Sequence, residues 1–383
     1  MQWMVPFNRL GETQLHVLDT CLRESAKTHW IQGFAGTGKT VLLLHAICEF
    51  RKKNPDGSVC IVVFTHALID LIKTGIPDHL GNIPVVTYKA FTSRPQHYDL
   101  IVVDEIQDLE SYVLPKLKEF SNSLIVAGDE NQSIYKNRVS PEDIEEDLSP
   151  NKLKLDVLYR LTHALKNIVR TILPNSGIEN ARSSRMANVQ ITLARADSRN
   201  EEIHWVLQQS RRYAKSGDPV AILFPAKFFV KQFIERVCSI EGVGCPEWVD
   251  NEWGQIDFGE TNEHLEENDI NLQYIGNQYG SLADSDDRPL VYLMTYHSAK
   301  GLDFDTVFLP FLDHDVRFWS DDQGLDRRLF FVAATRSRSN LFMSYSKNQP
   351  HLYIQSMPQD DLHKISCEIS QSSGGSDDSY DFF

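Results

Sequence analysis

Residues 33–40, GFAGTGKT, place glycines, a lysine and a threonine at a spacing that suits phosphate groups. Glycine lets backbone N–H groups turn toward phosphate oxygens, and a helix that begins at such a loop presents its positive end. In this pattern the lysine reaches the β- and γ-phosphates and the threonine reaches Mg²⁺. We therefore expect a nucleoside triphosphate, ATP, with Mg²⁺, held by Gly33, Gly36, Gly38, Lys39 and Thr40.

Two acidic residues follow an apolar run in LIVVDEIQDL, residues 100–109. The run predicts a buried strand, which carries Asp104 and Glu105 to its carboxyl end, where ligands bind in open α/β sheets. Asp104 suits the Mg²⁺ shell, and Glu105 suits the base that activates a water molecule. A kinase that phosphorylates a metabolite has less need of the adjacent glutamate. The pattern therefore favours ATP hydrolysis.

Short apolar runs alternate with segments of helical period along the chain, which predicts an α/β fold of parallel sheets flanked by helices. A helix is expected to begin at the phosphate loop and to cover 40–53. The polar stretch 139–152 is the expected domain boundary. We expect an N-terminal domain at 1–145, a C-terminal domain at 146–350, and an extension at 351–383 with a disordered acidic tail from about 369.

The net charge of −15 is distributed unevenly over the 383 residues. Thirteen acidic residues and one arginine lie in 241–290, a short acidic insertion, and three more acidic residues lie in 371–383. The remaining chain is neutral, so a nucleic-acid partner is not excluded. The beginning of the sequence lacks the pattern of a signal peptide, no apolar run is long enough for a membrane span, and the six cysteines have no zinc spacing. We expect a cytoplasmic protein.

The motifs, taken in order, resemble the UvrD/Rep-like branch of superfamily 1 DNA helicases, in a reduced form. The resemblance runs from Asn8 to about Ser346. Besides the two segments above, it rests on NRLGETQLHVL (8–18), VFTHALID (63–70), VVTYKAFT (85–92), VAGDENQSIY (126–135), LDVLYR (155–160), MTYHSAKGLDFD (294–305) and RRLFFVAATRSR (327–338). It implies two RecA-like P-loop NTPase domains with the ATP site in the cleft between them.

The resemblance also implies residue roles. The residues implied on the nucleotide are Gln14 and Tyr159 at the adenine, Gly301 and Asp303 on the nucleotide side, and Gln132, Arg160 and Arg336 at the γ-phosphate. The residues implied in strand contact are Thr65, His66, Thr87, Tyr88, Phe91, Tyr135, Thr295 and His297. Because the arginines lie in the second half, domain closure would depend on ATP.

The sequence departs from the family pattern in three ways. The large helical insertion after Asp70 is missing, and the interval between VAILF (220–224) and MTYHSAKG is short. Asn137 stands where a base-stacking tryptophan is expected. One aromatic stack contributes about 1–3 kcal/mol, so we expect a weaker grip on the strand and poor duplex unwinding.

Two functions from different classes remain open. The first is an ATP-dependent translocase or helicase on single-stranded nucleic acid, DNA with 3′ to 5′ movement by family resemblance, with RNA as the alternative. The second is a DNA-stimulated ATPase switch that regulates a protein partner such as a nuclease. A metabolite kinase explains none of the motifs in the second half. The acidic tail, which ends in Phe382 and Phe383, could dock on a partner or fold back on the strand site.

Overall fold

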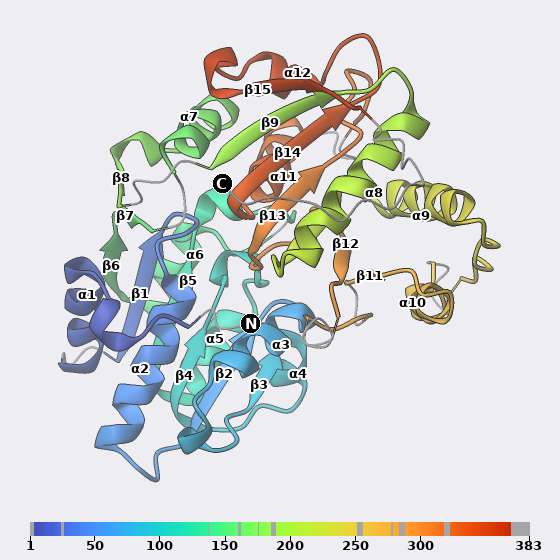
Figure 1. The fold of residues 1–383 in the computed structure, drawn as a ribbon. Helices are drawn as coiled ribbons and strands as arrows, with labels where there is room; N and C mark the ends of the chain where they lie inside the picture. The colour runs from blue at the N-terminus through green and yellow to red at the C-terminus, as the bar shows by residue number, and fades with distance from the viewer. Residues whose placement is uncertain are drawn as a thin grey trace.

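A computed structural model describes residues 4–23, 27–136, 138–159, 162–174, 176–184, 189–250, 256–276, 279–282, 288–317 and 322–368. These residues form two parallel sheets, one in the lower and one in the upper half of Figure 1. The two sheets are the cores of two RecA-like domains, as the sequence predicts. No helix in the described ranges is long and apolar enough to cross a membrane.

The first sheet has six strands in the order β3-β2-β4-β5-β1-β6. The strands are β1 (Thr28–Gly33), β2 (Val59–Val63), β3 (Val85–Thr87), β4 (Tyr98–Val103), β5 (Ser121–Gly128) and β6 (Asn151–Leu155). The helix α1 (Glu12–Arg23) precedes β1, and the strands are connected by α2 (Lys39–Lys53), α3 (His66–Gly75), α4 (Tyr88–Ser93), α5 (Val113–Glu119) and α6 (Pro141–Leu148).

Both faces of this sheet are covered, which explains the continuous apolar runs of its strands. In β4, Leu100 and Val102 face one apolar cluster, and Ile101 and Val103 face another. The first cluster includes residues of α2 and α3, and the second includes residues of α4, α5 and α6. The carboxyl ends of β1, β4 and β5 therefore share one edge, which is where the phosphate loop and the acidic residues lie.

The second sheet has seven strands in the order β11-β12-β10-β13-β14-β9-β15. The strands are β9 (Gln190–Arg195), β10 (Val220–Phe224), β11 (Leu272–Tyr274), β12 (Val291–Thr295), β13 (Phe304–Leu309), β14 (Ser337–Tyr345) and β15 (His363–Ser366). Its helices are α7 (His163–Ile172), α8 (Arg199–Lys215), α9 (Lys227–Glu241), α10 (Phe258–Glu267), α11 (Gln323–Ala334) and α12 (Leu352–Gln355). A short parallel pair, β7 (Val157–Leu158) and β8 (Arg182–Ser183), lies between the sheets along the chain.

The first sheet continues past the predicted boundary at 145/146. The stretch 139–152 contains α6, whose Ile144 and Leu148 are buried in the first domain. Ser140 and Asp143 cap this helix reciprocally, so polar residues that resemble a linker serve as a helix start. The strand β6 then pairs with β1. The first sheet therefore extends to Leu155.

The predicted extension 351–383 also contributes to the second domain. Its β15 pairs with β9 at the edge of the second sheet, and Cys367 is buried beside α8. The acidic tail from 369 lies outside the described residues.

Candidate functional site

The phosphate loop joins β1 to α2 and adopts a conformation that depends on glycine. Gly38 has φ +85°, and a Cβ at this position would lie 2.5 Å from Gln14 Nε2. The side chain of Lys39 folds back into the loop, where Nζ donates to the carbonyl oxygens of Gly33 at 2.9 Å and Phe34 at 3.2 Å. These two carbonyl oxygens accept the N–H groups of Lys39 that would otherwise donate to phosphate oxygens.

Gln14 and Tyr159 lie at the other end of the loop. Gln14 Nε2 donates to the Thr37 carbonyl at 3.0 Å, and its Oε1 accepts from the Gly11 amide at 3.0 Å. Tyr159 donates its amide to the Gly36 carbonyl at 2.9 Å, and any side chain at Gly11 would collide with the Tyr159 hydroxyl. The predicted adenine residues thus come together from the first turn of α1 and the segment after β6.

Asp104 and Glu105 follow β4 and are both buried. Thr40 Oγ1 donates to Asp104 Oδ2 at 2.6 Å, and burial raises the pKa of Asp104, with a further rise from the Glu105 carboxylate. Burial alone would raise the pKa of Glu105, but the ammonium groups of Lys300 and Lys39 outweigh it and lower this pKa. Glu105 is therefore held as a carboxylate.

The backbone of Glu105 is strained. Its φ of +54° is rare for a residue with a Cβ and costs on the order of 1–3 kcal/mol. Gln107 Nε2 donates to Glu105 Oε2, and Gln107 Oε1 accepts from the Asp129 amide at 3.1 Å. This bridge from β4 to β5 fixes the direction of the carboxylate.

Three residues of the second domain reach the first domain at this point. Arg336 is buried, and its Nη2 donates to Gln132 Oε1 at 3.1 Å. Burial lowers the pKa of Arg336 to about 10, so the guanidinium stays charged at neutral pH. Lys300 Nζ lies 2.6 Å from Asp108 Oδ1, with both side chains buried, and also donates to the Gln132 carbonyl. Next to Lys300, a Cβ at Gly301 would lie 2.5 Å from Leu68 of α3.

These groups surround one pocket of about 350 Å³ that is lined by both domains. The predicted residues that line it are Gln14, Gly36, Gly38, Lys39, Thr40, Glu105, Gln132, Tyr159, Gly301, Asp303 and Arg336. Gly33 and Asp104 lie behind this surface, against Lys39 and Thr40 respectively. Arg160 lies outside the described residues.

Sequence reasoning missed several residues of the cleft. Arg9 and Arg338 line the pocket, and Lys300 and Asp108 form a buried ion pair between the two domains. Arg338 lies 3.6 Å from Asp303, which was predicted to face the nucleotide. The signal was present for Lys300 and Asp108, because both belong to quoted motifs, but no pattern within one motif indicates a partner in another.

The residues fit a nucleotide with Mg²⁺. Thr40 and Asp104 place a hydroxyl and a carboxylate oxygen together, and a Mg²⁺ ion prefers a few such oxygens plus phosphate and water. In the described part of the chain, no group of three His, Cys, Asp or Glu side chains forms a metal centre.

The predicted strand contacts do not converge in the same way. Thr65, Thr87 and Thr295 each accept a hydrogen bond from a backbone N–H three residues later, as cap residues do. Their side-chain oxygens are thus used inside the protein. His66, the first residue of α3, is exposed.

Tyr88 and Phe91, two further predicted strand contacts, are buried in the structure. Their exposed fractions are only 2% and 3%, and both rings pack in the cluster under α4 and α5. Tyr88 also stacks on Phe64 and donates from its hydroxyl to Glu110 Oε1 at 3.1 Å. A buried ring has no free face for a base, so in this conformation the two residues support the fold.

Tyr135 and His297 lie close together at the interface of the two domains. Their ring centroids are 5.7 Å apart, and Tyr135 also contacts Phe64 at 4.7 Å. Arg138 lies over the rings of Tyr135 and Phe64 at 5.6 and 5.5 Å. Burial, and to a smaller degree Lys300, lowers the pKa of His297, so its imidazole is neutral at pH 7. His297 lies on the same turn, 296–300, that carries Lys300 into the cleft.

Two family models match the chain. Residues 257–348 match the UvrD-like helicase C-terminal domain, and residues 29–212 match the viral superfamily 1 RNA helicase core domain. Together the two matches cover the phosphate loop, the acidic residues and Arg336.

The chain is also similar to curated helicases over part of their length. A putative ATP-dependent DNA helicase of Acanthamoeba polyphaga mimivirus is 23% identical over 254 residues, which are 63% of this chain and 34% of the relative. DNA helicase II of Rickettsia typhi is 34% identical over 90 residues, 21% of this chain and 14% of the relative. The chain thus spans about a third or less of these relatives. The helicase of PRRSV aligns over 90% of this chain and 56% of its own, with 17% identity and a TM-score of 0.43.

Proposed function

We propose that this chain, which is a UvrD/Rep-like member of helicase superfamily 1, hydrolyses ATP between its two domains and uses the cycle to move along single-stranded nucleic acid. The observation that carries the proposal is the contact of Arg336 with Gln132 across the nucleotide pocket. A cation of one domain then reaches the phosphates bound by the other, and ATP controls closure of the domains.

In the proposed hydrolysis, Lys39 and Arg336 hold the phosphates from opposite sides of the pocket. Lys39 exchanges the carbonyls of Gly33 and Phe34 for phosphate oxygens, since both are hydrogen-bond acceptors for the same ammonium. Mg²⁺, when bound by Thr40 and Asp104, supplies charge neutralisation at the phosphates. The carboxylate of Glu105 takes the proton of the attacking water.

Gln132 is the proposed relay between nucleotide and strand. Its side chain accepts from Arg336 and donates to Asp129, and its carbonyl accepts from Lys300. The 296–300 turn joins Lys300 to His297, which is next to Tyr135. A change at the γ-phosphate that moves Gln132 would therefore move the residues proposed to contact the strand. The finer proposal is DNA as the strand and 3′ to 5′ as the direction, both from the family resemblance.

The deciding experiment measures ATP turnover by the purified chain with single-stranded DNA, duplex DNA, single-stranded RNA and no nucleic acid. We expect stimulation by single-stranded DNA and weak or absent unwinding of a tailed duplex, because the accessory insertions of the family are missing from the sequence. Lys39→Ala is the control that must abolish turnover in all four conditions. Turnover that no nucleic acid stimulates would contradict the motor and favour the switch that regulates a protein partner.

A further inference from the structure

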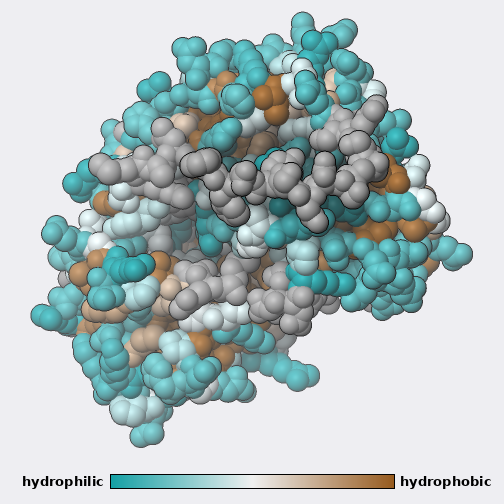
Figure 2. Space-filling model, in the orientation of Figure 1, coloured by the Kyte–Doolittle hydropathy of each residue, from teal (hydrophilic) through white to brown (hydrophobic). Residues whose placement is uncertain are grey.

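The first turn of α9 exposes an aromatic ring that no motif assigns. Phe228 is 59% exposed, whereas the other apolar residues on later turns, Val230, Phe233 and Ile234, are buried. The neighbouring Phe229 anchors the turn, because its ring lies 5.7 Å from that of Phe311. Phe228 is therefore a single ring held at the surface by a fixed helix. Figure 2 shows apolar surface in the area of α9.

This turn lies at the sheet edge that carries two predicted strand contacts. Phe224 at the end of β10 pairs with Thr295 at the end of β12, and the Phe224 carbonyl accepts from the Tyr296 amide at 2.9 Å. The helix α9 begins three residues after Phe224, and His297 lies two residues after Thr295. The two segments leave neighbouring strands at the same edge, so one nucleic-acid strand can reach both.

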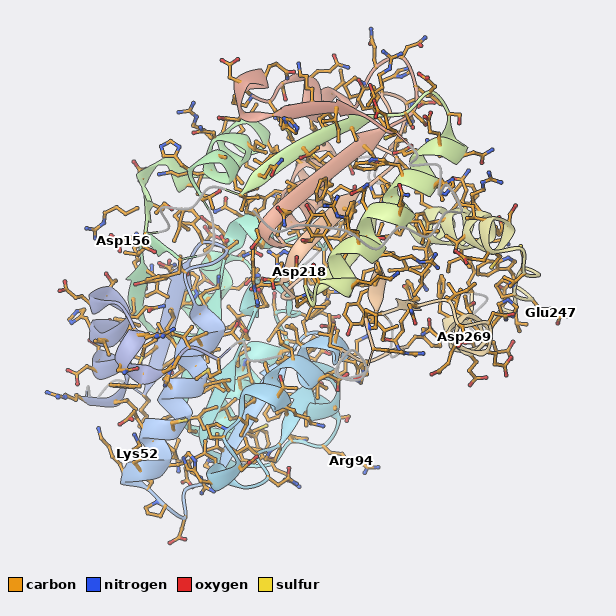
Figure 3. The ribbon with its side chains drawn as sticks, viewed as in Figure 1. Lys52, Arg94, Asp156, Asp218, Glu247 and Asp269 are labelled. Atoms are coloured by element: carbon orange, nitrogen blue, oxygen red, sulfur yellow. The ribbon has the colours of Figure 1, made fainter. Side chains whose placement is uncertain are left out.

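The charge around Phe228 suits a polyanion. Lys227 precedes it and Lys231 lies one helical turn later, while the first acidic residue of α9 is Glu235. Ala226, the N-cap residue, makes no side-chain cap hydrogen bond, and the helix dipole places its positive end at this turn. Two aromatic rings of the acidic stretch pack against these lysines: Lys231 lies 4.9 Å from the ring centroid of Trp248, and Lys227 lies 5.9 Å from that of Phe258. The carboxylate of Glu247, in the same stretch, lies at the right-hand edge of the molecule in Figure 3.

We propose that the first turn of α9 is a binding platform for single-stranded nucleic acid, in which Phe228 stacks on a base and Lys227 and Lys231 contact the flanking phosphates. The inference rests on the proposed function and names a contact of the same strand. The nucleic-acid strand fits this turn better than a protein partner does, because the exposed ring of Phe228 is flanked by two lysines. The platform would supply the stack that Asn137 does not provide.

The test compares the affinity of wild type, Phe228→Ala, Phe228→Leu and Phe228→Trp for labelled oligothymidylate and oligouridylate. We expect the Ala and Leu variants to bind about 5- to 150-fold more weakly, the range for loss of one base stack, and the Trp variant to bind at least as tightly as wild type. Leucine keeps an apolar side chain without a π-face, so this series separates stacking from apolar contact. Leu352→Ala, at an exposed apolar residue of α12, is the matched control and should bind like wild type.

A second readout concerns the lysines. The double change Lys227→Gln and Lys231→Gln should reduce the slope of log affinity against log salt concentration by about 1.4, since each phosphate contact on a single strand contributes about 0.7. Thermal unfolding verifies that each variant is folded. Wild type that binds neither oligonucleotide would overturn the proposed function itself. Wild type that binds while Phe228→Ala and Phe228→Leu stay within twofold of it would overturn only the platform.

Discussion

The nucleotide cleft and the strand-contact segments differ in how their predicted residues are used. In the cleft, eleven predicted residues line one pocket, and their donors and acceptors face each other across it. In the strand segments, three threonines cap turns or helices and two aromatic residues are buried. Tyr135 and His297 come together there across the two domains, with their ring centroids 5.7 Å apart.

The difference has a physical cause. Phosphate and Mg²⁺ accept few kinds of ligand, so residue type and spacing indicate the site directly. A strand is held by stacking, cations and backbone contacts, for which many residues serve equally. Threonine and aromatic residues in such segments also satisfy local needs, as Thr87 does at the start of α4. A motif can thus mark a strand-binding region while its individual residues support the backbone.

The largest expected effect is in the cleft, at Arg336. Arg336→Ala should reduce the turnover of ATP by about 10³- to 10⁵-fold, because the cation that crosses to the phosphates is lost, while nucleotide affinity changes much less. Steady-state kinetics and binding of a fluorescent ATP analogue measure the two effects. Arg327→Ala, which removes an exposed arginine of α11, the helix that precedes Arg336, is the control.

Since Arg336 is buried, thermal unfolding and an Arg336→Lys variant accompany this test. Turnover near the wild-type level in a folded Arg336→Ala protein would contradict this prediction. ATP hydrolysis in the cleft would then not depend on the second domain.

The next effect concerns Glu105. Glu105→Gln should lower the single-turnover rate about 10²- to 10⁴-fold and leave ATP binding intact, because the amide keeps the shape and cannot accept the proton of water. Glu130→Gln, an exposed carboxylate after β5, is the matched control and should retain turnover. A rate unchanged by Glu105→Gln would assign the base to another group.

The buried ion pair between the domains gives a smaller effect, on stability. Lys300→Met leaves Asp108 buried without its partner, so the free energy of unfolding should fall by about 3–5 kcal/mol. The double variant Lys300→Met and Asp108→Leu should recover most of this loss, because no buried charge remains. Chemical denaturation measures both. A single variant as stable as wild type would show that the closed arrangement does not depend on this pair.

The same pair predicts a pH dependence. Burial raises the pKa of Asp108 to about 7 in the folded chain, and Lys300 opposes this rise. A carboxyl with a raised folded-state pKa destabilises the fold progressively as pH increases from its unfolded value of about 4 toward the folded value. In Lys300→Met the folded-state pKa rises further. The variant should therefore lose more stability than wild type between about pH 6 and about pH 8.

The sequence was sufficient where local chemistry decides. The phosphate loop, Asp104 and Glu105 at the end of β4, and the parallel strands follow from spacing and apolar runs. The end of the first sheet could not be predicted in this way, because the stretch that forms α6 is mostly polar and contains only two buried apolar residues, Ile144 and Leu148. The pairing of Lys300 with Asp108 depends on how two domains meet, and 192 positions separate the partners. A motif of a few residues carries no information about a partner so far away in the sequence.

The smallest expected effect sharpens the comparison within the strand segments, through one substitution made at two phenylalanines. Phe91→Leu changes a ring that is 3% exposed, so it should cost up to about 1.5 kcal/mol of stability and leave strand affinity within twofold of wild type. Phe228→Leu changes a ring that is 59% exposed and should do the reverse, with weaker strand binding and little change in stability. Thermal unfolding and oligothymidylate binding of both variants, side by side, decide the matter. If Phe91→Leu weakened strand binding as much as Phe228→Leu, the α4 segment would have to open on binding the strand, and burial in the free protein would not separate structural from strand-contacting residues.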